Sequence, residues 1–259
     1  MLTIFKNIYL FRELILNLVL REVQMRYRRT FFGFLWSFLN PLLLMMVYTL
    51  VFSLFVRIKM ENYSSFVFCG LLPWIWFTSS LNDGVNSLIS NAQLVTKTYF
   101  PVEILPVVSV LTHLVNYLFS LPLLIMFLMF NKISLGLPLL ICFIPLLLFQ
   151  FLFTQGLVFI TAALNVYFRD VQHILGNLLT LWFFLCPIIY PFSIIPEKYK
   201  FLIYLNPMAL FSMAYQNISF FNRYPELPSF ITLLSVSSTI FFIGSALFSR
   251  LKPVFAEEL

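Results

Sequence analysis

Residues 164–176 read LNVYFRDVQHILG and mark an abrupt change along the chain. A long apolar run ends there, Arg169 and Asp170 stand side by side, and a second apolar run begins. About 20 apolar residues are enough to cross the roughly 30 Å hydrocarbon core of a bilayer as a helix. A charged step between two such runs indicates a short turn at a membrane surface.

The composition of the whole chain points the same way. Of its 259 residues, 61% are hydrophobic and only 10% are charged, whereas soluble domains carry about 25% charged residues. Membrane β-strands would alternate in polarity over about ten residues, and no such pattern occurs. The sequence therefore predicts an all-α, polytopic membrane protein with a single transmembrane domain over residues 1–259.

Six apolar segments are expected to span the membrane. They are 34–56, 66–89, 104–130, 135–164, 174–195 and 230–249. The second ends in the polar stretch SSLNDGVNSLIS, which we expect to face protein or water. With a cytoplasmic N-terminus, ten of the sixteen Lys and Arg residues fall on the inside, as the positive-inside rule requires. An even span number then places the C-terminus inside as well.

The first 30 residues precede these spans and look like a surface segment. Residues 8–25 place apolar side chains at helical spacing on one face: Leu10, Phe11, Leu14, Ile15, Leu18, Val19 and Val23. The pattern predicts an amphipathic helix that lies on the cytoplasmic membrane surface, packs against a protein partner, or does both. The apolar run is interrupted by Arg12, Glu13 and Asn17, so we do not expect a cleavable signal peptide.

The stretch from residue 191, at the end of span five, to the start of span six is apolar but contains five prolines. Each uninterrupted piece is too short to span, so two short helices near 197–205 and 208–220 are expected to dip into the outer leaflet. Irregular backbone at membrane depth requires protein or water around it. These helices are therefore expected to cap a pathway, with a simple surface hairpin as the alternative.

Residues that carry enzyme chemistry are scarce. None of the seven glycines begins a GxxxxGK[ST] phosphate loop, and metal-binding Cys/His spacings are absent. The three cysteines suit buried apolar positions, and His113 suits a hydrogen-bonded core residue. Asp83 is the only carboxylate inside an expected span, and it suits a polar network at an inner vestibule better than a proton-coupling role.

Large aromatic side chains concentrate in spans one, two and five. Some serve a lipid or interfacial belt, but the faces of sugars also pack well on aromatic rings, and many weak contacts let a polymer slide. We expect these rings to line a pathway at or near a dimer axis. The candidate channel residues are Trp36, Tyr48, Trp74, Phe77, Asp83, Trp182 and Tyr190.

Five stretches in order resemble the permease subunits of type-2 ABC exporters. They are RYRRTFFGFLWSFLNP at 26–41, LLPWIWF at 71–77, LNVYFRD at 164–170, CPIIYP at 186–191 and YLNPM at 204–208. The resemblance covers nearly the whole chain and is closest to exporters of O-antigen, capsular polysaccharide or teichoic acid. It implies a homodimer in the bacterial inner membrane that binds two copies of a separate ATPase, which would hold ATP and Mg; this chain would hold no cofactor.

The resemblance also implies roles for particular segments. Residues 8–25 would form the interface helix, the 91–104 and 165–173 loops would contact or support the ATPase, and 196–220 would form re-entrant gate helices. The candidate coupling residues are Arg12, Glu13, Lys97, Tyr99, Phe100, Arg169 and Asp170. The candidate outer-gate residues are Pro196, Tyr199, Asn206 and Pro207.

Two other functions remain open at this stage. A type-2 exporter of lipids or small drugs would share the architecture. An integral-membrane glycosyl or acyl transferase would need converging acids and histidines, and the loops carry few of them. An adjacent ATPase gene and glycosyltransferase genes would favour the polysaccharide exporter.

Overall fold

The computed structural model describes residues 2–28, 30–97 and 101–258, and this part of the chain is helical without a β-strand. The elements in chain order are α1 (Leu2–Leu10), α2 (Arg12–Tyr27), a 3-10 turn (Gly33–Leu35), α3 (Trp36–Leu50), a π-helical turn (Val51–Phe55), α4 (Tyr63–Asn86), a 3-10 turn (Ile89–Asn91), α5 (Ala92–Lys97), α6 (Ile104–Phe130), α7 (Leu137–Tyr167), α8 (Val171–Phe184), a 3-10 turn (Phe192–Ile194), α9 (Glu197–Tyr204), α10 (Pro207–Ser219), α11 (Leu227–Leu251), a 3-10 turn (Lys252–Val254) and α12 (Phe255–Glu258).

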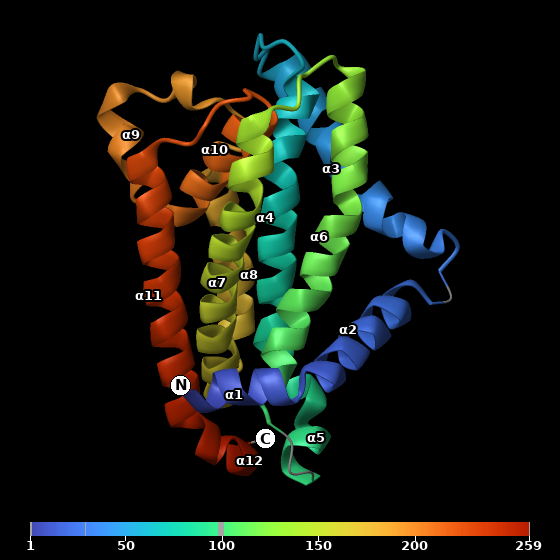
Figure 1. Ribbon diagram of the computed structural model, residues 1–259, viewed down its shortest axis with the longest axis vertical. Helices are drawn as coiled ribbons and strands as arrows, with labels where there is room; N and C mark the ends of the chain where they lie inside the picture. Colours follow the sequence, from blue (N-terminus) through green and yellow to red (C-terminus); the bar gives the residue numbers. More distant parts are fainter. Residues whose placement is uncertain (1, 29, 98–100, 259) are drawn as a thin grey trace.

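The long helices stand side by side in a bundle (Figure 1). We call the end with α1, α5 and α12 the lower end and the end with α9 the upper end, as drawn there. Five segments are long and apolar enough to cross a membrane: Gly33–Phe55, Tyr63–Asn86, Ile104–Phe130, Leu137–Tyr167 and Leu227–Val254. These five agree with the expected spans to within a few residues.

The expected fifth span is shorter than the sequence suggested. Its helix, α8, has 14 residues, which at 1.5 Å per residue is about 21 Å and falls short of the hydrocarbon core. The helix does not continue to residue 195 as predicted, because the chain turns after Phe184 and Pro187 has no N–H to continue a helical ladder. The six-span count therefore stays a prediction.

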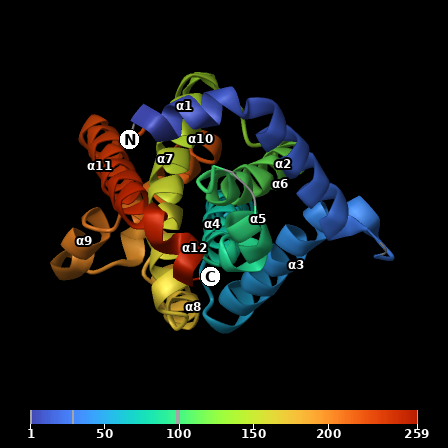
Figure 2. The same cartoon turned by 90° about the horizontal axis from the view of Figure 1, so that it is seen from below.

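Helix α4 forms the centre of the bundle. It contacts α3, α6, α7, α8 and α10, and its side chains are buried along nearly its whole length. Seen from below, α3, α6, α7 and α8 are arranged around it (Figure 2). The polar back half of this span faces protein, as expected, since Ser80, Gly84 and Val85 are all buried.

The N-terminal segment consists of two helices instead of the single one expected, because the chain breaks at Phe11 between α1 and α2. Both run along one side of the bundle at its lower end (Figure 2). The predicted apolar face packs on the lower core, where Ile15 and Val19 are buried. Leu10, at the end of α1, is 66% exposed and does not take part in this packing.

The closest helix crossing joins α7 and α11. A Cβ atom on Gly244 would lie 2.2 Å from the carbonyl oxygen of Gly156, and one on Gly156 would lie 2.6 Å from that of Ile240. The two backbones therefore touch, as small residues permit in membrane helices. Phe159 continues this contact towards the lower end, where it packs against Phe241 and Phe248.

Candidate functional site: aromatic cluster, polar network and gate

Four of the six predicted channel rings meet between α3, α4 and α8. Tyr48 lies 5.1 Å from Phe183, measured between ring centroids, and Trp74 lies 5.5 Å from the same ring. Phe77 lies 5.6 Å from Trp74 and 5.4 Å from Trp182. We call these five residues the aromatic cluster. Trp74 and Phe77 are buried, whereas Tyr48 and Trp182 are half-buried.

The other two predicted rings lie apart from the aromatic cluster. Trp36 packs edge-on against Phe32, 5.4 Å away, and Tyr190 donates its hydroxyl to the Phe184 carbonyl at 2.9 Å. Within this single chain the cluster rings contact one another and α7. That these residues line a transport path stays a prediction.

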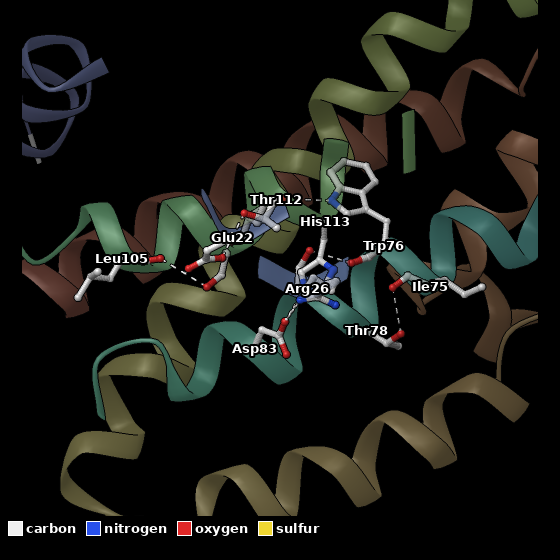
Figure 3. A network of polar contacts seen from close by, with 12 residues as sticks. Glu22, Arg26, Ile75, Trp76, Thr78, Asp83, Leu105, Thr112 and His113 are labelled. Carbon is white, nitrogen blue, oxygen red and sulfur yellow. Dashed lines mark hydrogen bonds and ion pairs between the residues drawn. The ribbon is translucent and has the colours of Figure 1, made fainter. Parts of the chain in front are cut away.

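Asp83 is the centre of a polar network that joins three helices near the lower end (Figure 3). Its Oδ2 atom accepts a hydrogen bond from Arg26 Nη2 on α2 at 2.5 Å and lies 2.8 Å from His113 Nε2 on α6. His113 is 5% exposed, while the side chains of Asp83 and Arg26 are half-exposed. The network therefore combines a buried imidazole with an ion pair that water can reach.

Glu22 extends this network by one turn of α2. Thr112 on α6 donates its hydroxyl to the Glu22 carboxylate at 3.2 Å. Loss of hydration beside α6 raises the pKa of Glu22, although the Thr112 hydrogen bond opposes the shift. Glu22, Arg26 and Asp83 line a polar cavity of about 530 Å³, which is consistent with the inner vestibule expected around Asp83.

A second polar contact ties together the chain ends and the start of α6. Glu103, 1% exposed, accepts from Lys252 Nζ at 2.7 Å and from Asn7 Nδ2 at 2.7 Å. The contact thus holds α1 and the end of α11 against the loop that precedes α6. We call Asn7, Glu103 and Lys252 the lower clasp.

The predicted coupling residues lie on exposed surfaces where they are described. Arg12 and Glu13 are exposed on α2, and Arg169 and Asp170 are exposed in the turn before α8. Arg169 makes no ion pair with Asp170 in the described part of the chain. Tyr99 and Phe100 lie outside the described residues, as does the side chain of Lys97.

Asn165 holds the turn that contains Arg169 and Asp170. Its Nδ2 group donates to the Val85 carbonyl at 3.0 Å and its Oδ1 accepts from Gln172 N at 3.3 Å. Asn165 is fully buried at the lower end of α7. The turn is therefore fixed to α4, the helix that also carries Asp83 and Trp74.

The two short helices expected before the last span are present as α9 and α10. Asn206 caps α10 by accepting from Met208 N and Ala209 N, and it also accepts from Trp182 Nε1 at 2.7 Å. Pro207 then begins α10, where a missing N–H costs nothing. Pro196 and Tyr199 are exposed at the start of α9. Asn206 thus links this segment to the aromatic cluster.

Several residues of these networks were missed by the sequence analysis. Arg26, Asn165 and Glu103 were noticed only as parts of motifs or loops. Their partners are 57 or more residues away in the chain, so local spacing carried no signal for them. An isolated polar side chain at the end of an apolar span was the one available indication.

The architecture and the ordered motifs are those of a transporter membrane domain, and the comparisons agree. The profile of the ABC-2 type transporter family matches residues 13–220, and the chain belongs to this family. It is 39% identical over its full length, and that of the relative, to the "O-antigen export system permease protein RfbA" of Myxococcus xanthus. It is 34% identical to the protein of the same name from Klebsiella pneumoniae, over 97% of this chain and 96% of the relative.

Proposed function

We propose that this chain is the permease subunit of an ATP-driven exporter that moves a lipid-linked polysaccharide across the bacterial inner membrane. The observation that most supports this proposal is the full-length similarity to relatives named O-antigen export permeases. An O-antigen-like glycan is the first candidate, and capsular polysaccharide or teichoic acid are the others. A lipid or small-drug exporter of the same family is the second candidate function.

The proposal includes a homodimer with two separate ATPase subunits that bind ATP and Mg. We place the second copy against α3 and α8, where Leu43, Leu50 and Leu181 are exposed and the aromatic cluster lies behind them. The aromatic cluster, which contains four of the predicted channel rings, would then lie beside the dimer axis. The ATPase would bind at the lower end, where Arg12, Glu13, Arg169 and Asp170 are exposed.

The proposed topology has six crossings and cytoplasmic termini. Helix α8 with residues 185–195 would form the fifth crossing, and α9 with α10 would form the re-entrant outer gate. The position of the first and last helices at the same end of the bundle supports an even number of crossings (Figure 1). Labelling of a cysteine at Lys6 from outside intact cells would contradict this topology.

The experiment that tests the function is deletion of the gene followed by complementation. Loss of surface polysaccharide, with accumulation of lipid-linked glycan inside the cell, is expected in the deletion strain. The wild-type chain should restore export, and it should fail to do so when the partner ATPase is inactivated. Unchanged surface polysaccharide in the deletion strain, with altered lipid or drug export, would favour the second candidate.

A further inference from the structure

A cavity of about 350 Å³ lies inside a single copy of the chain, between α3, α4 and α6. Its lining includes Trp36 and Asn40 from α3, Trp76 and Ser79 from α4, and Tyr117 from α6, with Arg26 of α2 also contributing. We call this space the α3–α4–α6 cavity. It is distinct from the aromatic cluster, which lies where α4 faces α8.

The cavity lies near the middle of the spans. Its lining on α6 runs from His113 to Ser120, so it begins nine residues after the start of α6 at Ile104. At 1.5 Å per residue that is about 14 Å along the helix. Polar groups at this depth are costly in a membrane and mark functional sites by default.

Two polar side chains of the lining form no hydrogen bond among the described residues: the amide of Asn40, which is exposed, and the hydroxyl of Ser79, which is half-buried. Other polar groups nearby are satisfied, since Ser37 donates to Phe34 O at 2.8 Å and Ser120 donates to Asn116 O at 3.0 Å. An amide and a hydroxyl that are not bonded within the protein can each donate to and accept from a ligand or water. The cavity therefore offers donors and acceptors to a polar occupant.

Aromatic rings supply the rest of the lining. Trp76 stacks on Tyr117 with ring centroids 5.4 Å apart and an interplanar angle of 14°, so this wall is rigid. Trp36 is half-buried and contributes a second indole. The face of an aromatic ring carries partial negative charge and attracts polarised C–H groups. Rings combined with amides and hydroxyls suit a sugar, which presents C–H groups and hydroxyls together.

Arg26 connects the α3–α4–α6 cavity to the polar cavity at the lower end, because it lines both. A guanidinium has five N–H donors, and the contact with Asp83 uses Nη2. The remaining donors suit a phosphate oxygen. A sugar in the cavity and a phosphate at Arg26 would be adjacent, as they are in a glycan linked to a lipid through phosphate.

We propose that the α3–α4–α6 cavity binds the first sugar of a polyprenyl diphosphate-linked glycan, with the phosphate beside Arg26. The inference rests on the proposed function and adds a substrate site within each protomer, separate from the path at the dimer axis. It assigns Trp36 to this cavity, whereas the sequence analysis grouped Trp36 with the channel rings.

The test measures binding to the purified permease–ATPase complex in lipid nanodiscs. The probes are polyprenyl diphosphate carrying one N-acetylhexosamine and the same lipid without a sugar. Asn40→Leu and Ser79→Val are each expected to weaken the glycosylated probe about fivefold, the equivalent of one hydrogen bond. Binding of the sugar-free lipid should change less than twofold in both variants. Arg26→Gln should weaken both probes.

Thr180→Val is the matched control, because Thr180 is exposed on α8 and bonds only to the Gly176 carbonyl of its own helix. It should bind both probes like the wild type. Wild-type affinity in both cavity variants would overturn the proposal. So would equal losses for the two probes, or full competition by phosphatidylglycerol, which would make the site a general phospholipid site.

Quenching of tryptophan fluorescence in the wild-type complex keeps the test valid if a variant fails to assemble. The glycosylated probe should quench the emission, and Trp36→Phe should reduce the quenching; no change on probe addition would count against the site. The complementation experiment separates the two claims. Restored export by a wild-type chain that does not bind the probe would overturn the cavity alone, and probe binding without any role in export would overturn the proposed function alone.

Discussion

The two ends of the bundle are held together by different chemistry. At the lower end, the contacts between distant segments include ion pairs: Lys252 with Glu103 and Arg26 with Asp83. At the upper end, the long-range contacts are neutral. Tyr63 donates to the Ile189 carbonyl at 2.5 Å, and Gln216 donates to the Pro187 carbonyl at 3.0 Å.

The difference follows from where the helices break. Residues 185–195 lie outside the α-helices at the upper end, so their carbonyl groups need other hydrogen-bond donors. In an apolar region, neutral donors can satisfy them without burying a charge. At the lower end, Arg26 and Asp83 line the polar cavity and keep part of their hydration, whereas Glu103 is buried and depends on its protein partners. Under the proposed function, the lower end with its charges would be the one that meets the ATPase, and the upper end would be the gate.

The largest effect is expected from breaking the lower clasp. Lys252→Met leaves the Glu103 carboxylate buried with only Asn7 as a described partner, so the free energy of unfolding should fall by about 3 kcal/mol. Thermal unfolding of the purified protein in detergent measures the loss. The double variant Glu103→Gln with Lys252→Met should recover most of it. If both variants lose the same amount, the charge is not the cause.

A somewhat smaller loss is expected at the α7–α11 crossing, which joins the two ends. Gly244→Ala places a Cβ atom against the Gly156 backbone, and the resulting overpacking should cost about 2 kcal/mol. Gly176→Ala on α8 is the control, because a Cβ there meets nothing within 4 Å and helix propensity favours alanine. Equal unfolding temperatures for the two variants would contradict the backbone contact.

At the upper end, removal of one neutral hydrogen bond should have a local effect. Trp182→Phe deletes the donor to Asn206 and should cost about 1 kcal/mol. Cys186 is buried beside Asn206, so it can report opening of this region. In a background with Cys69 and Cys142 changed to serine, a thiol reagent should label Cys186 faster in the Trp182→Phe variant. An unchanged labelling rate would mean that the bond does not hold the segment.

The smallest effect concerns Glu22 and pH. Its pKa is raised above the ordinary value of 4.5 mainly by desolvation, so the folded state disfavours its ionised form relative to the unfolded state. The protein should lose a little stability as pH rises through that raised pKa. Glu22→Gln should then unfold at most about 2 °C higher at pH 7.5 and equally at pH 4. Glu13→Gln, an exposed change on the same helix, controls for net charge.

The sequence predicted what depends on local pattern. The long apolar runs predicted five of the membrane-spanning helices. The prolines at 196 and 207 predicted the bounds of α9 and α10 nearly to the residue. The polar half of α4 was correctly expected to avoid lipid. The end of α8 was missed because Leu185, Cys186 and Ile188 continue the apolar run, although Pro187 and a tight turn stop the helix.

The rest depended on contacts between residues far apart in the chain. The aromatic rings of spans one, two and five were expected to line a pathway, which stays a prediction. Within the chain, Tyr48, Trp74 and Trp182 belong to one cluster with Phe77 and Phe183. Trp36 does not, because it lies near the start of α3 and faces α6 across the α3–α4–α6 cavity. Hydropathy gives the segments that cross the membrane but not which face of each one meets another helix.

The glycine crossing makes α7 and α11 a single mechanical unit. With the Gly244 backbone seated against that of Gly156, neither helix can slide along the other without separating the pair. Phe255 extends the unit below the last span, where it packs against Phe248 and Tyr167. A displacement of α7 anywhere in the bundle would therefore be transmitted to the C-terminal segment, where a pair of spin labels on α11 and α2 could measure it as a change in distance during turnover.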